Sequence, residues 1–133
     1  MKFFPFYVVL LGLYMGRANA IATENTTLVS QTRVEEFIVR GNEPFWSVTI
    51  SRNGIIYSTP ESPNRRYPYT APISAAGRPP EVVRVYRLNG QPSGLLVIKK
   101  ADSCSDTMSD IVYPYSATLI LGNRVLDGCA QKR

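Results

Sequence analysis

The sequence predicts an all-β fold: a small antiparallel barrel or sandwich of about eight short strands with one disulfide. Short runs of β-branched and aromatic residues alternate with polar residues along the chain. Turn signals rich in Gly, Asn and Pro separate these runs, and no segment has the apolar period of an amphipathic helix. A sheet in so small a domain must hide its edges, which favours closure into a barrel or a sandwich.

Alternation and one tight turn predict the first three strands. The Asn53-Gly54 pair is the strongest hairpin signal in the chain, because both residues tolerate a positive φ. The segments on either side of it alternate apolar and polar residues or are rich in β-branched ones. The predicted strands are residues 34–40, 45–50 and 55–58.

The middle of the domain is rich in proline. Six of the ten prolines lie between Pro60 and Pro80, and proline cannot donate a hydrogen bond within a central strand. The pattern admits one edge strand, at residues 66–73. Its inner face would consist of the odd-numbered residues Tyr67, Tyr69, Ala71 and Ile73.

Four further strands are predicted towards the C-terminus, at residues 82–88, 95–100, 113–121 and 124–126. Asn-Gly and Gly-Asn pairs form the turns, and a polar loop spans residues 101–110. Cys104 lies in that loop, and Cys129 lies just past the last strand. In an oxidising compartment the two would pair. The bond would fasten the C-terminal hairpin and stabilise the fold by about 3 kcal/mol.

The N-terminal residues have the three parts of a secretory signal peptide. Lys2 precedes an apolar run at residues 3–15, and the small residues Ala18 and Ala20 form a cleavage site. The run is shorter than the roughly 20 residues that span a bilayer, so we expect cleavage rather than anchoring. Cleavage after Ala22 is the alternative position.

The predicted organisation is a signal peptide at residues 1–20, a flexible lead-in at residues 21–33 and a single β domain at residues 34–133. We expect a periplasmic or secreted, soluble monomer after cleavage near Ala20, with no stable membrane span. Cleavage removes two basic residues and no acid, so the formal net charge falls from +5 to +3. This modest, scattered charge does not favour a nucleic-acid partner.

The residue types that carry most enzyme chemistry are missing or used elsewhere. The chain has no histidine, which excludes serine–histidine triads, cysteine–histidine pairs and histidine metal sites. It has no glycine-rich phosphate loop, and a disulfide would consume both thiols. We therefore expect no catalytic residue, no metal and no cofactor. A hydrolase that uses paired carboxylates is the remaining enzymatic alternative.

The densest polar segment is residues 102–110, where aspartates recur at every fourth position. Oxygen ligands of this kind can bind Ca²⁺. The segment lacks the alternating ligands and the central Gly of an EF-hand loop. A tight turn beside the disulfide is therefore favoured, with Asp and Ser oxygens accepting backbone hydrogen bonds.

Aromatic and basic residues provide a second candidate site. Tyr, Trp and Arg dominate the energetic centres of protein interfaces. The candidate binding surface consists of Arg65, Arg66, Tyr67 and Tyr69. Trp46, by contrast, is predicted to be a core residue, because it shares the apolar face of its strand.

Two groups of motifs resemble a known family. The first is Gly41-Asn42-Glu43-Pro44-Phe45-Trp46, followed by Gly54-Ile55-Ile56-Tyr57. The second is Cys104-Ser105-Asp106-Thr107-Met108-Ser109-Asp110, then Tyr113-Pro114-Tyr115 and Gly128-Cys129-Ala130. Together they resemble an uncharacterised family of bacterial envelope proteins over about residues 36–130. The resemblance implies bacterial export, a β fold and a bond between the two cysteines, and it implies no known activity.

The chain departs from the family pattern in two ways. Thr107 stands where Gly is usual, and the lipid-attachment cysteine of many members is missing, which implies a free protein. The motif residues of unspecified role are Glu43, Pro44, Phe45, Trp46, Asp106, Met108, Ser109, Asp110, Tyr113 and Pro114. Some members are similar to, or joined with, the lysozyme-inhibitor β-barrels of the envelope, so the resemblance implies inhibition as an alternative.

The predicted function is that of an exported, non-catalytic β domain of the cell envelope with a binding or structural role. Its partner would be an unknown envelope protein or glycan. The alternatives are an inhibitor of a secreted hydrolase such as lysozyme and a carboxylate-based hydrolase.

Overall fold

The computed structural model describes residues 12, 16, 33–106 and 110–133, and its compact unit is Thr32–Arg133. The predicted signal peptide and lead-in lie almost wholly outside the described residues, as do the motif residues Met108 and Ser109. Within the described part of the chain, no helix is long and apolar enough to cross a membrane.

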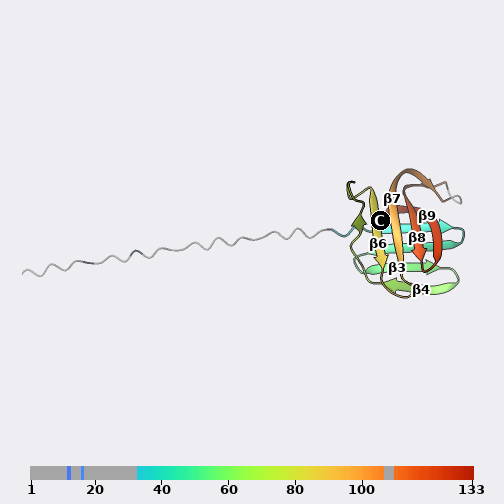
Figure 1. The fold of residues 1–133 in the computed structure, drawn as a ribbon, viewed down its shortest axis with the longest axis horizontal. Helices are drawn as coiled ribbons and strands as arrows, with labels where there is room; N and C mark the ends of the chain where they lie inside the picture. The colour runs from blue at the N-terminus through green and yellow to red at the C-terminus, as the bar shows by residue number, and fades with distance from the viewer. Residues whose placement is uncertain (1–11, 13–15, 17–32, 107–109) are drawn as a thin grey trace, which may run out of the picture. The chain divides into compact units, whose positions relative to one another are not determined.

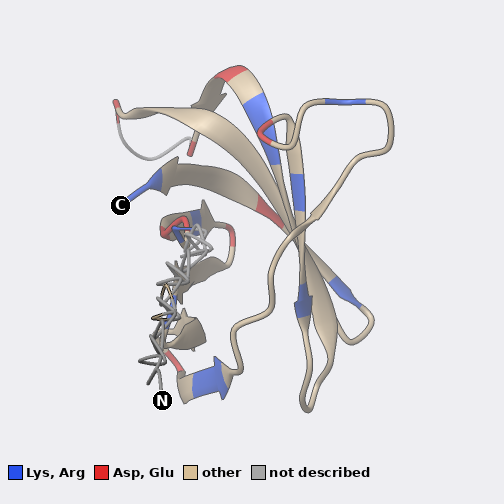
Figure 2. Cartoon of the chain, turned by 90° about the vertical axis from the view of Figure 1, so that its left-hand side faces the viewer, with Lys and Arg blue, Asp and Glu red and all other residues tan. Residues whose placement is uncertain are grey.

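The described residues form one antiparallel sheet of nine strands and no helix (Figure 1). The strands are β1 (Phe37–Asn42), β2 (Phe45–Ser51), β3 (Gly54–Thr59), β4 (Ser62–Tyr67), β5 (Ile73–Ser74), β6 (Val83–Leu88), β7 (Gly94–Ser105), β8 (Val112–Leu121) and β9 (Arg124–Lys132). The sheet curls into a half-barrel whose two halves face each other (Figure 2). The predicted all-β class is confirmed, with nine strands where about eight were expected and, of the predicted barrel and sandwich, a curled half-barrel.

Two meanders make up this sheet, and the pairing of β1 with β9 joins them. The order of the strands is β4-β3-β2-β1-β9-β8-β7-β6-β5. Val39 on β1 lies opposite Ala130 on β9. The strands nearest the two ends of the domain therefore lie in the middle of the sheet. Its edges are β4, which contains Pro63, and β5, which has two residues, and both features discourage pairing with other chains.

The core fills the concave side of the sheet, because alternate residues of each strand point inwards. Val48 on β2 and Leu96 on β7 are fully buried there. Trp46 is also buried, which confirms its predicted place in the core. The Asn53-Gly54 hairpin is confirmed, with Gly54 at a φ of 138°, a conformation that favours glycine.

Side-chain hydrogen bonds tie the end of β4 and the chain after it to β6 and to the turn between β6 and β7. The hydroxyl of Tyr67 donates to the carbonyl of Pro92 at 2.7 Å. The hydroxyl of Thr70 donates to the carbonyl of Arg87 at 2.9 Å. These bonds hold the two halves of the curled sheet together where β4 and β6 are not hydrogen-bonded neighbours.

The predicted edge strand at residues 66–73 is wrong in its bounds. The structure has two edge strands, β4 before it and β5 at its end, and no strand covers residues 68–72. Pro68 and Pro72 lack the N–H that a sheet ladder needs. Ala71 and Ile73 are exposed rather than inward-facing.

The C-terminal strands are longer than predicted. Strand β7 continues to Ser105 through a register shift between Lys100 and Cys104, so the first half of the predicted polar loop is strand. Strand β9 continues to Lys132 because it pairs with β1 as well as β8. Cys129 therefore lies inside the last strand, not after it.

The predicted disulfide between Cys104 and Cys129 is confirmed, with a Cα–Cα distance of 5.7 Å. It joins β7 to β9 although β8 separates them in the sheet. After the register shift that follows Lys100, Cys104 pairs with Tyr113 on β8. The bond closes a segment with a sequence separation of 25 residues.

Candidate functional site

The turn between β1 and β2 places two adjacent aromatic residues on opposite sides of the sheet. The side chain of Phe45 is 53% exposed, whereas that of Trp46 is buried. The indole packs on two glycines. A Cβ atom on Gly41 would overlap the indole nitrogen, and one on Gly128 would lie 2.9 Å from the indole ring. Glycine at both positions therefore lets Trp46 enter the core beneath the turn.

Two hollows flank Phe45. The first has a volume of about 330 Å³ and includes Trp46 and Arg40 in its lining. The second has a volume of about 450 Å³ and is lined in part by Pro44, Arg65 and Arg124. We call this region the Phe45 corner, defined by Pro44, Phe45, Trp46, Arg65 and Arg124.

The Phe45 corner contains a buried hydrogen-bond donor without a partner. Among the described residues, nothing accepts the indole N–H of Trp46. Most buried polar groups in folded proteins are bonded to protein, water or ligand. An exposed aromatic ring with arginines nearby is a combination that is enriched at protein interfaces.

Beside the Phe45 corner, the disulfide brings the motif segments together. The amide of Asn42 donates to the backbone carbonyl of Asp106. The buried Tyr113 donates to a carboxylate oxygen of Asp106 at 3.4 Å. A hollow of about 230 Å³ here is lined in part by Glu43, Asp106 and Asp127. The motifs thus meet in space although they are far apart in the sequence.

The segment at residues 102–110 does not form the predicted tight turn as a whole. Residues 102–105 belong to β7, and residues 107–109 lie outside the described part of the chain. Asp110 and Pro114 are exposed. In the ranges that the structure describes, no group of three His, Cys, Asp or Glu side chains is arranged to hold a metal ion.

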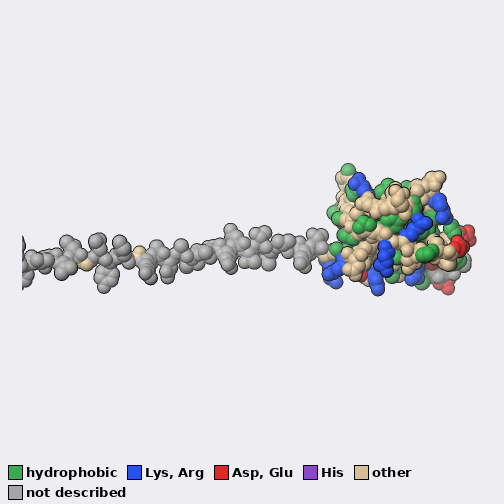
Figure 3. Space-filling model, turned by 90° about the horizontal axis from the view of Figure 1, so that it is seen from below, with side chains coloured by type: hydrophobic (Ala, Val, Ile, Leu, Met, Phe, Trp, Pro, Cys, Tyr) green, Lys and Arg blue, Asp and Glu red, His purple; other side chains and the backbone are tan. Residues whose placement is uncertain are grey.

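The structure separates the four residues of the candidate binding surface. Arg65 reaches the carbonyl of Gln91 at 3.5 Å and lines a hollow at the Phe45 corner. Arg66 is exposed, Tyr67 is buried by its bond to Pro92, and Tyr69 packs against the core. Tyr67 therefore does not lie on a surface. In the view of Figure 3, Lys and Arg side chains are spread among hydrophobic ones.

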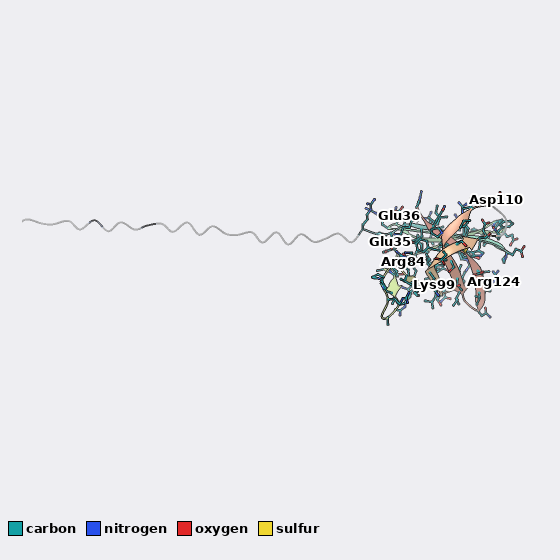
Figure 4. All side chains as sticks on the ribbon, turned by 90° about the horizontal axis from the view of Figure 1, so that it is seen from above. Glu35, Glu36, Arg84, Lys99, Asp110 and Arg124 are labelled. Carbon is teal, nitrogen blue, oxygen red and sulfur yellow. A yellow bond between two sulfur atoms is a disulfide. The ribbon has the colours of Figure 1, made fainter. Side chains whose placement is uncertain are left out.

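A further cluster, which the sequence reasoning missed, surrounds Arg84 on β6. Arg84 is only 4% exposed and makes a two-pronged ion pair with Glu35, with distances of 2.6 Å and 2.9 Å. Its remaining terminal nitrogen donates to the carbonyl of Glu81 at 2.7 Å. Figure 4 shows Glu35 and Arg84 side by side. The sequence contained a signal for this cluster, because Arg84 alternates with its neighbours on the same inward face of β6 as Tyr86 and Leu88.

Aromatic rings and a lysine complete this cluster. The guanidinium of Arg84 lies 5.2 Å from the ring centre of Phe37 and 5.5 Å from that of Tyr115, distances suited to cation–π attraction. Lys132 approaches Glu35 to 2.8 Å. The hydrogen bond from Arg84, aided by that from Lys132, lowers the pKa of Glu35 from 4.5 to about 2 despite partial burial.

Two tyrosines lie beside the ion pair. Tyr86 is fully buried, and nothing in the described part of the chain bonds to its hydroxyl. Burial, together with the nearby Tyr69 and Glu35, raises the pKa of Tyr86. Burial and the charge of Glu35 also raise the pKa of Tyr69. Both hydroxyls therefore stay protonated near neutral pH and can donate hydrogen bonds.

Comparison with models of protein families, with curated proteins and with solved structures finds no match to this chain.

Proposed function

We propose that this chain is an exported, non-catalytic binding domain of the bacterial cell envelope that contacts its partner through the Phe45 corner. The observation that carries the proposal is the exposure of Phe45 between two hollows. An exposed aromatic ring flanked by arginines resembles the anchor of a protein interface. Phe45 lies within the motif that resembles the envelope family, between Pro44 and Trp46.

Export is supported by the N-terminal sequence and by the disulfide. Residues 1–20 have the three parts of a signal peptide. Cys104 and Cys129, the only cysteines of the chain, are bonded to each other, as is usual in oxidising compartments. N-terminal sequencing of protein purified from a bacterial periplasm should begin at Ile21 or Thr23. A start at Met1 would contradict export with cleavage.

A non-catalytic role is supported by the side chains that the chain provides. It contains no histidine, and the disulfide uses both thiols. Acid–base or nucleophilic chemistry would therefore depend on carboxylates, lysine or tyrosine. The hydrolase alternative is favoured only by Glu43, Asp106 and Asp127, which line one small hollow. Hydrolysis of envelope glycans that stops in Asp127→Asn would support that alternative instead.

The test of the Phe45 corner is a comparison of two exposed apolar side chains. Full-length protein, processed by its own host, would be immobilised and used to capture proteins and glycans from envelope extract. Phe45→Ala should weaken capture of the specific partner at least 10-fold, because an aromatic anchor contributes about 2 kcal/mol or more. Val125→Ala is the control, since Val125 is 68% exposed on the convex face of β9.

Two outcomes would refute the Phe45 proposal. One is that no partner is retained above the level of an unrelated β domain. The other is that Phe45→Ala and Val125→Ala retain the same partner equally well.

Inhibition of a secreted hydrolase is the second candidate function. It is favoured by the same exposed ring, because a projecting aromatic residue with Arg65 and Arg124 nearby could enter the cleft of an enzyme. Purified protein would be titrated into a lysozyme activity assay. Inhibition that Phe45→Ala relieves supports this function, and full lysozyme activity at a large molar excess excludes it for lysozyme.

A further inference from the structure

A larger hollow lies at the other end of β1 from Phe45. Its volume is about 610 Å³, compared with about 330 and 450 Å³ for the two hollows beside Phe45. Glu35 precedes β1, Arg84 and Tyr86 come from β6, and Tyr69 comes from the segment between β4 and β5. We call it the Tyr86 hollow, lined by Arg33, Val34, Glu35, Tyr69, Ala71, Pro72, Ser74, Pro80, Glu81, Arg84 and Tyr86.

The buried charges of the Tyr86 hollow are paired with each other. Both carboxylate oxygens of Glu35 are engaged, one by Arg84 and the other by Arg84 and Lys132. Arg84 also donates to the backbone of Glu81. The four charged residues of the lining are two arginines and two glutamates, so the lining itself carries no formal net charge. A charged ligand would have to compete with the existing ion pair, and it would lose hydration on entry.

Unlike these charged groups, the hydroxyl of Tyr86 is buried without a hydrogen-bond partner among the described residues. Leaving such a group unpaired destabilises a fold, and structures usually satisfy it with protein, water or ligand. Tyr86 is itself one of the residues that line the hollow, together with Tyr69, Glu35 and Arg84.

The rest of the lining is mainly apolar. Val34, Ala71, Pro72 and Pro80 contribute hydrocarbon surface. The ring of Tyr69, which packs against the core, adds a flat aromatic wall. Pockets for small molecules commonly combine apolar walls with a few well-placed polar groups. A flat apolar ligand that carries one acceptor oxygen matches both the walls and the unused donor.

We propose that the Tyr86 hollow binds a neutral small molecule, or a neutral group of a larger one, through a carbonyl oxygen that accepts from Tyr86 and a flat apolar part that packs on Tyr69 and the prolines. This site is separate from the Phe45 corner and does not depend on the function proposed for it.

The probe for this site is acetanilide, which joins a neutral amide carbonyl to a flat ring. The isotopically labelled full chain would be titrated while backbone NMR shifts are followed. The shifts of Ser74, Arg84 and Tyr86 should saturate, and those of Trp46 should stay unchanged. Phenylacetate and benzylammonium, which carry the same ring with a negative or positive charge, should bind at least 10-fold more weakly.

Two variants distinguish the contribution of the Tyr86 hydroxyl to binding from that of the free volume in the hollow. Tyr86→Phe should weaken acetanilide binding about 10-fold, because it removes only the hydroxyl. Ala71→Trp should abolish binding by filling the hollow from an exposed position. Tyr67→Phe is the control, since that hydroxyl is already bonded to Pro92 and Tyr67 does not line the hollow.

Three results would overturn the proposal. Acetanilide shifts that do not saturate would show that the hollow does not select this chemistry. Equal binding by Tyr86→Phe and the unchanged chain would show that the hydroxyl is satisfied by water alone. Tighter binding of either charged probe would refute the selection of a neutral ligand. A well-dispersed spectrum of each variant establishes that it is folded.

Discussion

The two ends of β1 present the same unusual feature in different surroundings. Each has, beside a hollow, a buried aromatic donor that no described residue accepts: Trp46 at one end and Tyr86 at the other. At the first end an exposed ring projects from a turn next to the disulfide. At the second end an internally satisfied ion pair forms one side of a larger hollow. The difference suggests that an unused donor beside a projecting ring suits a macromolecule, whereas one inside a hollow suits a small ligand.

The largest expected effect is a loss of stability on removal of the disulfide, with structural changes only at the end of the molecule near it. Replacing both cysteines, Cys104→Ser with Cys129→Ser, should lower the free energy of unfolding by about 3 kcal/mol, because the unfolded chain regains the entropy of the closed loop. Urea denaturation measures this loss. Backbone NMR shifts should change around Asn42 and Asp106 and stay constant around Arg84. Changes of equal size at both ends would mean that the disulfide supports the whole sheet.

The second prediction concerns the ion pair. Glu35→Gln should lower the free energy of unfolding by about 2 kcal/mol, because it leaves the buried Arg84 without its anionic partner. The value is below that of a fully buried pair, since the side chain of Glu35 is 37% exposed. Glu36→Gln is the matched control and should change stability by less than about 0.5 kcal/mol. Equal effects of the two substitutions would show that the pair contributes nothing.

Low pH should lower the free energy of unfolding through the same ion pair. The pKa of Glu35 is about 2 in the fold and 4.5 in its absence, so the fold gains stability from the ionised carboxylate above about pH 5. That gain should disappear as the pH falls from 5 towards 2. Allowing for solvent screening, the loss in the unchanged chain should exceed that in Glu35→Gln by about 1 kcal/mol. Parallel urea midpoints of the two proteins across this range would contradict the low pKa.

The smallest effect compares two buried tyrosine hydroxyls. Tyr67→Phe should cost about 1 kcal/mol, because it removes a hydrogen bond to Pro92. Tyr86→Phe should cost nothing or should stabilise the fold slightly, because its hydroxyl has no partner among the described residues. Thermal unfolding of both variants tests the contrast. A loss of stability in Tyr86→Phe as large as that in Tyr67→Phe would mean that ordered water satisfies the hydroxyl.

Hairpins were predicted well because their signals are local. The Asn53-Gly54 turn and the strands beside it depend on residues a few positions apart. The last strand was predicted to span residues 124–126, from its tight turn with the strand before it. In the fold this segment continues as a strand, since β1 supplies hydrogen bonds on its other side. No local pattern contains that information.

The candidate sites show the same contrast between local sequence signals and contacts between distant residues. The alternation of the strand predicted that Trp46 is buried, but it did not reveal the two hollows that flank Phe45. The residues of the candidate surface at 65–69 do not lie on one face: Tyr67 ends β4 and is buried, whereas Tyr69 follows the strand and lines the Tyr86 hollow. The ion pair was missed because Glu35 and Arg84 are 49 positions apart.

By itself, the sequence determined the all-β class, most of the strands, the cysteine pair and the absence of histidine. These properties follow from composition, from period-two alternation and from turns of two residues. Only the tertiary structure decided the pairing of β1 with β9, the hollows beside Phe45 and the Tyr86 hollow. Each of these depends on which distant strands become neighbours, and that choice is made by the burial of the whole core rather than by any one segment.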